Sequence, residues 1–324
     1  MYVQEIKDLP AGKSITGFFL VKAVNCKTTQ NNAKYLDILL GDKTGELNAK
    51  LWDCSDEDER LYLEQMLVKV KGTIGLWQGR MQLKIERIRP AQEEDGLDIE
   101  DFVPVAPEKP EVMFERVLQY INEIRNKDIK AVVGQVVEET KDKLMYYPAA
   151  KQNHHSVQGG LLYHILTMLT VGEKLSEIYS WINRDLLYGG IILHDIAKVD
   201  EMDAGPLGMV SDYSVEGQLL GHIVQGIKRI DRTARKLGVA EEVSLLLQHM
   251  VLSHHYEPEF GSPKRPMIPE AELLHYIDII DARMYDMAKN LENTSRKEFS
   301  DKVWVLHNRR LYKSGVGTDE DEVF

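Results

Sequence analysis

Several His and Asp residues in the second half of the chain could bind metal ions together. They follow the order H…HD…H…HH…D and are His164, His194, Asp195, His222, His254, His255 and Asp278. Imidazole nitrogens and carboxylate oxygens are the ligands that Mn, Fe, Co, Ni and Zn take in proteins. A lone histidine would mean little. The ordered set, with Lys198 three residues after Asp195, predicts a metal site.

The adjacent pair His194–Asp195 sets a condition on the backbone. Neighbouring side chains on a helix point about 100° apart, so the pair cannot face one point from the middle of a helix. At a helix end that faces a cavity, Asp195 can bridge two metal ions while His194 holds one. Helical bundles build such dinuclear sites from several helices. By the same constraint, only one of His254 and His255 faces a metal, and the other contacts substrate or supports a ligand.

Helices are the elements that must position these residues. Apolar residues recur at helical spacing in six segments: 112–124, 161–175, 186–196, 219–237, 241–252 and 271–287. The candidate ligands lie in or near several different segments. The pattern predicts an all-α bundle from residue 111 to about residue 310, with a site at its centre.

Residues 1–90 are predicted to form a small β barrel. Apolar and alternating runs bounded by turn residues predict strands at 14–24, 34–40, 46–52, 67–77 and 81–88. A polar, acidic segment at 55–65, with Ser55 as its N-cap, predicts a short helix. A helix between the third and fourth strands is the order of the five-stranded OB fold. The predicted fold class is therefore multidomain, with an all-β OB barrel followed by an all-α bundle.

The barrel carries aromatic residues on which bases could stack. They are Phe18, Phe19, Tyr35, Trp52 and Trp77. OB folds bind single strands through aromatic stacking and a basic groove, although aromatics in a small barrel also fill its core. Alternation along the strand predicts that one of Phe18 and Phe19 points outward. Single-strand binding by this unit is an expectation.

Composition and charge limit the classes of partner. The 324 residues carry a net charge of −12, yet residues 1–90 hold fourteen Lys and Arg against twelve Asp and Glu. The acidity is concentrated in residues 91–110, predicted to be a Pro-containing linker, and in an acidic tail at 311–324, predicted to be disordered. This balance argues against tight binding to duplex DNA. The absence of long apolar runs and the presence of only two cysteines predict a cytoplasmic protein without a membrane partner.

These features resemble a known family. The segment HDIAK resembles the HD-x-x-K core of the HD-domain metal-dependent phosphohydrolases, and an OB-like unit joined to such a domain resembles the YhaM-type 3′→5′ exoribonucleases. The segments KQNHHSVQGGLLYHILTM, IILHDIAKVDEM and VLSHHYEPEFGSPKRPMIPEAELLHYIDIIDA carry the resemblance. It covers both predicted domains. The Gly-Tyr-Pro that follows the HH pair in cyclic-di-GMP phosphodiesterases is absent from HHYEPEFGSP, which argues against a cyclic dinucleotide substrate.

The resemblance implies a ligand set. His164, His194, Asp195 and Asp278 would surround one divalent ion, and Asp195 would bridge to a second ion held by His222 and His254, with His255 in support. Asp281 is an alternative to Asp278. The expected metal is Mn²⁺, with Co²⁺, Fe²⁺ and Mg²⁺ as alternatives. Lys198 is expected to contact the phosphate, or else to be a solvated lysine at a helix end.

Four further residues are candidates for contact with substrate or with the ligands. Lys151, His154 and His155 precede Gly159–Gly160, and Arg265 lies before Pro266. An ordinary polar loop is the alternative in each case.

The expected function is metal-dependent 3′→5′ hydrolysis of single-stranded RNA to nucleoside 5′-monophosphates, with single-stranded DNA as an alternative substrate. The polarity and the RNA preference come from the resemblance. Two other functions are open: an HD hydrolase of small nucleotides with a regulatory OB domain, and a non-catalytic single-strand-binding protein. Homo-oligomerisation is also left open.

Overall fold

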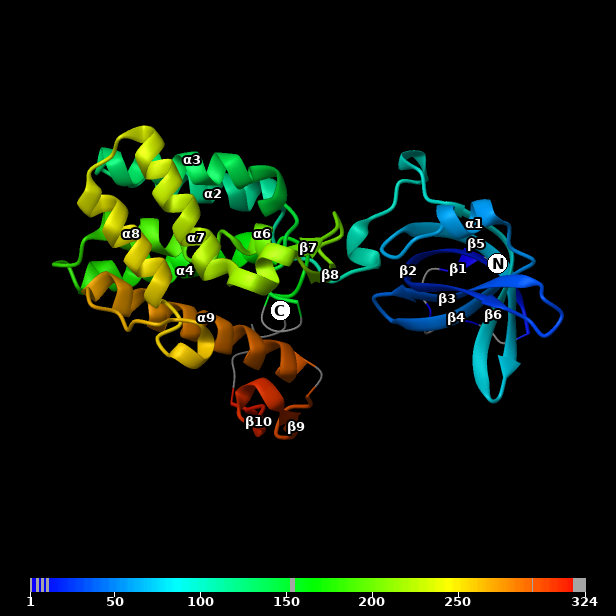
Figure 1. Cartoon of the computed structure of the whole chain (residues 1–324). Helices are drawn as coiled ribbons and strands as arrows, with labels where there is room; N and C mark the ends of the chain where they lie inside the picture. Colours follow the sequence, from blue (N-terminus) through cyan, green and yellow to red (C-terminus); the bar gives the residue numbers. More distant parts are fainter. Residues whose placement is uncertain are drawn as a thin grey trace. The chain divides into compact units, whose positions relative to one another are not determined.

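The computed structural model describes residues 2–3, 6, 9, 12–151, 155–292 and 294–316. Contacts divide the chain into two units, Met1–Val105 and Ala106–Phe324 (Figure 1). The division falls within residues 91–110, where proline and acidic residues predict a linker. That segment contains two 3₁₀ turns, η2 (Glu93–Asp95) and η3 (Ile99–Asp101). Each unit is described by itself below.

The first unit is a closed OB barrel, as predicted. Its strands are β1 (Tyr2–Val3), β2 (Ser14–Thr28), β3 (Lys34–Asp42), β4 (Gly45–Trp52), β5 (Leu67–Trp77) and β6 (Arg80–Pro90). The order in the sheet is β1-β2-β3-β4-β6-β5, and pairing of β2 with β5 closes the barrel. Helix α1 (Asp56–Leu61) lies between β4 and β5 in sequence. Ser55 caps it, because the Ser55 side chain accepts from the Asp58 amide while the Asp58 side chain accepts from the Ser55 amide.

The barrel is filled by apolar side chains that alternate along its strands. Phe19, Ile38 and Leu83 are fully buried in this core. Phe18 points to the opposite side of β2, where the ammonium of Lys69 lies 4.8 Å from its ring centroid. Phe18 therefore lies on the outer side of β2, as alternation predicts, but it is buried and offers no exposed ring for stacking.

The second unit is a helical bundle. Its helices are α2 (Pro110–Glu123), α3 (Lys127–Leu144), α4 (Gly160–Ile178), α5 (Arg184–Leu193), α6 (Lys198–Glu201), α7 (Val215–Leu237), α8 (Glu241–Ser253) and α9 (Pro269–Glu292). The six predicted helical segments are present. Helix α3 was missed, although its buried face repeats at helical spacing and Asn126 caps its first turn. Its run of β-branched valines suits a strand as well as a helix, which makes the sequence signal ambiguous.

The second unit also contains two small hairpins, one between α6 and α7 and one after α9. Strands β7 (Met202–Ala204) and β8 (Val210–Tyr213) pair after α6, and β9 (Phe299–Val303) pairs with β10 (Arg309–Tyr312) after α9. The prediction that residues 311–324 are disordered is wrong at its start, because β10 extends to Tyr312 and Leu311 is buried in a small cluster that includes Leu306. Residues 317–324 of that tail lie outside the described residues. No helix in the described part of the chain is long and apolar enough to cross a membrane.

A glycine in β5 permits a close approach between two barrel strands. A Cβ at Gly72 would lie 2.2 Å from the carbonyl oxygen of Lys84 on β6, where the strand register shifts. We expect Gly72→Ala to lower the free energy of unfolding of the barrel by about 1–3 kcal/mol. Gly75→Ala in the same strand is the control, since a Cβ there would meet only Gln82 oxygen at 3.9 Å. Hydrogen exchange of β5 and β6 amides measures the difference, and equal protection in both variants would contradict this account.

Candidate metal centre

The break between α5 and α6 places the His194–Asp195 pair. Helix α5 ends at Leu193, His194 is its C-cap, and Asp195 lies in the turn before α6 begins at Lys198. His194 and Asp195 are both buried. His194 keeps helical backbone angles (φ −56°, ψ −42°) as the C-cap, and Asp195 follows where α5 has ended. The prediction of a helix end at this pair is confirmed.

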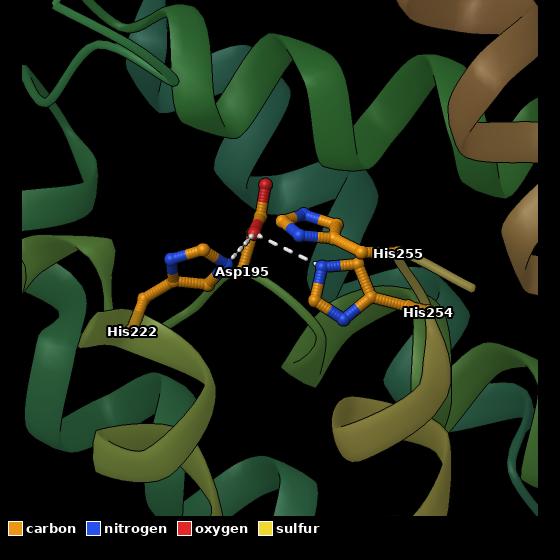
Figure 2. A group of neighbouring side chains, drawn as sticks. All are labelled: Asp195, His222, His254 and His255. Carbon is orange, nitrogen blue, oxygen red and sulfur yellow. Dashed lines mark ion pairs between the residues drawn. The ribbon is translucent and has the colours of Figure 1, made fainter. Parts of the chain in front are cut away.

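The carboxylate of Asp195 faces two different groups of imidazoles. Its Oδ2 lies 3.3 Å from His194 Nε2 and 3.8 Å from His164 Nε2. Its Oδ1 lies 3.3 Å from His222 Nε2 and 3.7 Å from His254 Nε2 (Figure 2). The ring nitrogens come from α4, the α5 terminus, α7 and the α8 terminus. One carboxylate is therefore shared between two sets of potential ligands.

The imidazoles are held with one nitrogen directed at Asp195. The Nδ1 atoms of His194 and His254 lie 2.7 Å and 2.8 Å from the carbonyl oxygens of Ile191 and Val251. A carbonyl only accepts, so each Nδ1 donates and each Nε2 carries a lone pair. Within the described residues, the buried Nε2 atoms of His194, His222 and His254 and Asp195 Oδ1 have no hydrogen-bond partner. Buried lone pairs that converge without donors are the arrangement that a divalent cation satisfies.

Two aspartates of α9 contact opposite sides of the His164 ring. Asp278 Oδ1 lies 3.4 Å from His164 Nε2, on the side of Asp195. Asp281 Oδ2 lies 2.7 Å from His164 Nδ1 and 2.7 Å from His155 Nε2. The carboxyl group of Asp281 is buried, which opposes its ionisation, but the hydrogen bonds from both histidines outweigh burial and hold its pKa below the usual range. Asp278 therefore faces the cluster, whereas Asp281 and His155 lie behind His164.

His222 depends on a kink in α7 and on an acidic residue that the sequence argument missed. Gly221 has a left-handed backbone (φ 67°) inside α7, immediately before His222. Glu201 Oε1 accepts from the His222 backbone amide at 3.0 Å and lies 3.1 Å from His222 Nδ1. Burial opposes ionisation of Glu201, yet the His222 contacts lower its pKa. Its position six residues after Asp195, in the last turn of the short α6, was the available sequence signal.

His254 and His255 both face the cluster. Helix α8 ends at Ser253, and the positive φ of Tyr256 (69°) turns the chain immediately after the pair. One potential ligand atom from each of His254, His255, Asp195 and His222 lies within 4.8 Å of the others. The prediction that only one of the two histidines faces a metal assumed a regular helix through the pair, whereas α8 ends at Ser253 and both rings offer a potential ligand atom to the cluster.

Lys198 is mostly buried beside Asp195. Its ammonium lies 2.6 Å from Asp195 Oδ2. Burial alone would lower the pKa of Lys198, but the charge of Asp195 outweighs burial and raises it. The reciprocal effect lowers the pKa of Asp195 well below its usual value despite burial. Lys198 is therefore a charged group at the cluster rather than a solvated lysine at a helix end.

A cleft of about 700 Å³ opens onto the cluster. It is lined by Asp195, Lys198, Glu201, His222, His254, His255, Tyr256, His275, Asp278, Arg283 and His307, among others. Lys151 and Arg265 lie outside this lining: Lys151 contacts Ser211 and Asp212, and Arg265 pairs with Glu257 at 3.0 Å. His155 is buried against Asp281, away from the cleft. His154 lies outside the described residues.

Among the barrel side chains that the structure describes, the exposed aromatics are Trp52 and Trp77. Trp52 is 42% exposed and packs on Tyr35 with ring centroids 4.7 Å apart, while Trp77, next to the β5–β6 turn, is 65% exposed. The lysines around Tyr35 are already paired. Lys27 and Lys50 lie 2.6 Å and 2.5 Å from Asp37, whose pKa is lowered to about 2 because these contacts outweigh its burial. Aromatic surface is therefore more available here than free positive charge.

Comparison with known proteins agrees with this architecture. The HD domain family matches residues 161–283, and the OB-fold nucleic acid binding domain family matches residues 20–91. The 3′-5′ exoribonuclease YhaM of Geobacillus sp. (strain WCH70) is 43% identical over 302 residues, which is 93% of this chain and 92% of the relative. The enzyme of the same name from Bacillus velezensis is 41% identical over 93% of this chain and 95% of its own length.

The buried His and Asp cluster in a helical bundle, following an OB barrel, defines a hydrolase of the HD type with a nucleic-acid-binding domain. At this identity and coverage, the chain belongs to the YhaM 3′-5′ exoribonuclease family.

The contacts of Glu201 lead to a prediction about metal affinity. Removal of a carboxylate that orients a ligating imidazole typically weakens metal binding about 10- to 100-fold. We expect Glu201→Ala to show a loss of this size, and Glu201→Gln a smaller one because the amide oxygen still accepts from His222. Calorimetric titration with Mn²⁺ measures the affinity. Glu216→Ala is the control, since Glu216 lies on α7 but is exposed and pairs with Lys228. Unchanged affinity in Glu201→Ala would contradict a supporting role.

Proposed function

We propose that this chain is a metal-dependent 3′-5′ exoribonuclease that removes nucleoside 5′-monophosphates from single-stranded RNA. The observation that carries the proposal is the shared carboxylate of Asp195, whose two oxygens face two separate sets of imidazoles. Family membership supports the direction of cleavage and the RNA substrate.

Two divalent cations would share Asp195. His164, His194 and Asp278 would hold the first ion, and His222, His254 and His255 the second. Asp281 orients His164 by accepting a hydrogen bond from its Nδ1, and Glu201 orients His222 in the same way. The donor set of imidazoles and carboxylates suits Mn²⁺, and Fe²⁺ or Co²⁺ fit the same chemistry.

When bound, a pair of such ions supplies a nucleophilic water at neutral pH and neutralises charge on the phosphate. The residues of the chain supply position and charge. Lys198 places an ammonium beside the cluster, where it can contact a phosphate oxygen once the carboxylate of Asp195 is shared with the cations. Burial of His194, Asp195 and His254 keeps water away from the inner side of the cluster.

The barrel would hold the strand while its 3′ end is cleaved. Trp52, Tyr35 and Trp77 offer ring faces on which bases can stack irrespective of sequence. Phe18 and Phe19 are excluded from this role by burial. Such a division of labour suits an enzyme that acts on many different RNAs.

The assay that tests the proposal uses a 5′-labelled oligoribonucleotide with Mn²⁺. We expect a ladder that shortens from the 3′ end and is abolished by EDTA. Asp195→Asn should lower the rate by at least about a thousandfold, because loss of the shared charge weakens both metal sites. Asparagine is preferred to alanine because the amide fills the space beside Lys198. Asp203→Asn, an exposed change on β7, is the control. Normal turnover in Asp195→Asn would contradict the dinuclear assignment.

Stacking on the barrel leads to a separate prediction. Base stacking on an aromatic side chain contributes about 1–3 kcal/mol per base, so Trp52→Ala should raise KM for a 20-nucleotide RNA about 5- to 140-fold. The dinucleotide ApA has no bases beyond those of the cleaved linkage to stack on Trp52, and its hydrolysis should change little. Steady-state kinetics on both substrates measure the contrast. An equal effect on both would show that Trp52 acts through the fold and not through the strand.

A further inference from the structure

The outer part of the cleft contains an arginine without an acidic partner. Two cationic side chains, Lys198 and Arg283, line the cleft within the described residues. Lys198 is paired with Asp195. Arg283 is exposed, and it makes no hydrogen bond or ion pair with the described part of the chain. By contrast, Arg265, on the loop before α9, is paired with Glu257. Arg283 therefore leaves a guanidinium available for an anion in the cleft.

Helix α9 sets the position of Arg283 relative to the cluster. The residues of α9 that line the cleft are His275, Asp278, Ile279, Ala282 and Arg283. Their spacing places them on one face of the helix. Arg283 is five residues beyond Asp278, which is about 7.5 Å along the helix axis. This separation is comparable to that between successive phosphates of a single strand.

The hairpin after α9 contributes to the lining of the same cleft as Arg283. Strands β9 and β10 lie beside the C-terminal part of α9 (Figure 1), and Val305 and His307 between them line the cleft. His307 and Asn308 both have a left-handed backbone (φ 59° and 56°) and form the turn between β9 and β10. The match to the HD domain ends at residue 283, so this part of the lining lies beyond it.

Burial decreases outward from the cluster. Asp195 and His254 are buried, Asp278 is partly exposed, and Arg283 and His307 are exposed. An exonuclease that cleaves from the 3′ end must hold its terminal phosphodiester at the deep end and let the 5′ part of the strand leave outward. The next phosphate on the path outward is the one on the 5′ side of the hydrolysed linkage.

We infer that Arg283 and His307 form a subsite for the phosphate one linkage upstream of the phosphodiester that is hydrolysed. The inference rests on the proposed function and adds a second phosphate to it. The guanidinium of Arg283 can donate two parallel N–H···O bonds to this phosphate. The ring of His307 donates a further bond from the hairpin. The subsite would favour substrates of three or more nucleotides over dinucleotides.

The test compares ApA, which has one phosphodiester, with ApApA, which also has the upstream phosphate. We expect wild-type kcat/KM to be higher for ApApA. Arg283→Ala should reduce the ApApA to ApA ratio about 10- to 100-fold, the range for a lost charge-assisted hydrogen bond. Arg283→Lys should recover part of the ratio, because the ammonium keeps the charge but not the paired donors. His307→Ala should reduce the ratio by a smaller factor. Lys302→Ala, an exposed change on β9 of the same hairpin, is the control and should keep the wild-type ratio.

A change in the substrate provides an independent arm. ApApA with a neutral methylphosphonate at the upstream linkage should lose its advantage with wild-type protein, and the loss should disappear in Arg283→Ala. Equal losses on ApA and ApApA in Arg283→Ala would overturn the inference, as would a wild-type enzyme indifferent to the methylphosphonate. Failure of wild-type protein to cleave either substrate, or any longer RNA, would instead overturn the proposed function.

Discussion

The carboxylate of Asp195 is buried among imidazoles, and much of the second unit is arranged to make that burial tolerable. An isolated charge in a protein interior costs several kcal/mol unless it is paired. Here the ammonium of Lys198 offsets part of the cost and keeps the pKa of Asp195 far below its usual value despite burial. His194 and His254 direct an Nε2 lone pair at this carboxylate, because their Nδ1 atoms are held by main-chain carbonyls. The break between α5 and α6 is what brings Asp195 and Lys198 together at the cluster.

Much of the metal centre could be predicted from the sequence, because histidines and aspartates in this order rarely occur without a metal-binding role. The His194–Asp195 pair also predicted a helix end, since no regular helix can direct both side chains to one point. For His254–His255 the same reasoning assumed a regular helix through the pair, although the periodic segment 241–252 ends before it, as α8 does at Ser253. Glu201 was missed since an acidic residue in a short helix is ordinary until the fold brings His222 onto it.

The fold was predictable where turns and alternation were regular, as in the barrel with its Ser55-capped helix. It was not predictable where tertiary packing decides. Phe18 lies on the outer side of β2 and is nevertheless buried, with the Lys69 ammonium over its ring, and alternation along a strand does not predict such burial. The valine run of α3 suits two secondary structures, and only its packing in the bundle selects the helix. The β9–β10 hairpin is short and mostly polar, so its contact with α9 leaves little trace in hydrophobic periodicity.

The hydrogen bonds that fix His194 and His254 to main-chain carbonyls bear on the entropy of ligation. Rings that could otherwise rotate are fixed during folding, so the loss of rotamer freedom is paid before any cation arrives. Cation binding then requires little reorganisation of the protein, and more of the intrinsic ligation energy is retained as affinity. Since these bonds reach backbone atoms of α5 and α8, the preorganisation is a property of the helices themselves and persists whichever nucleotide occupies the cleft.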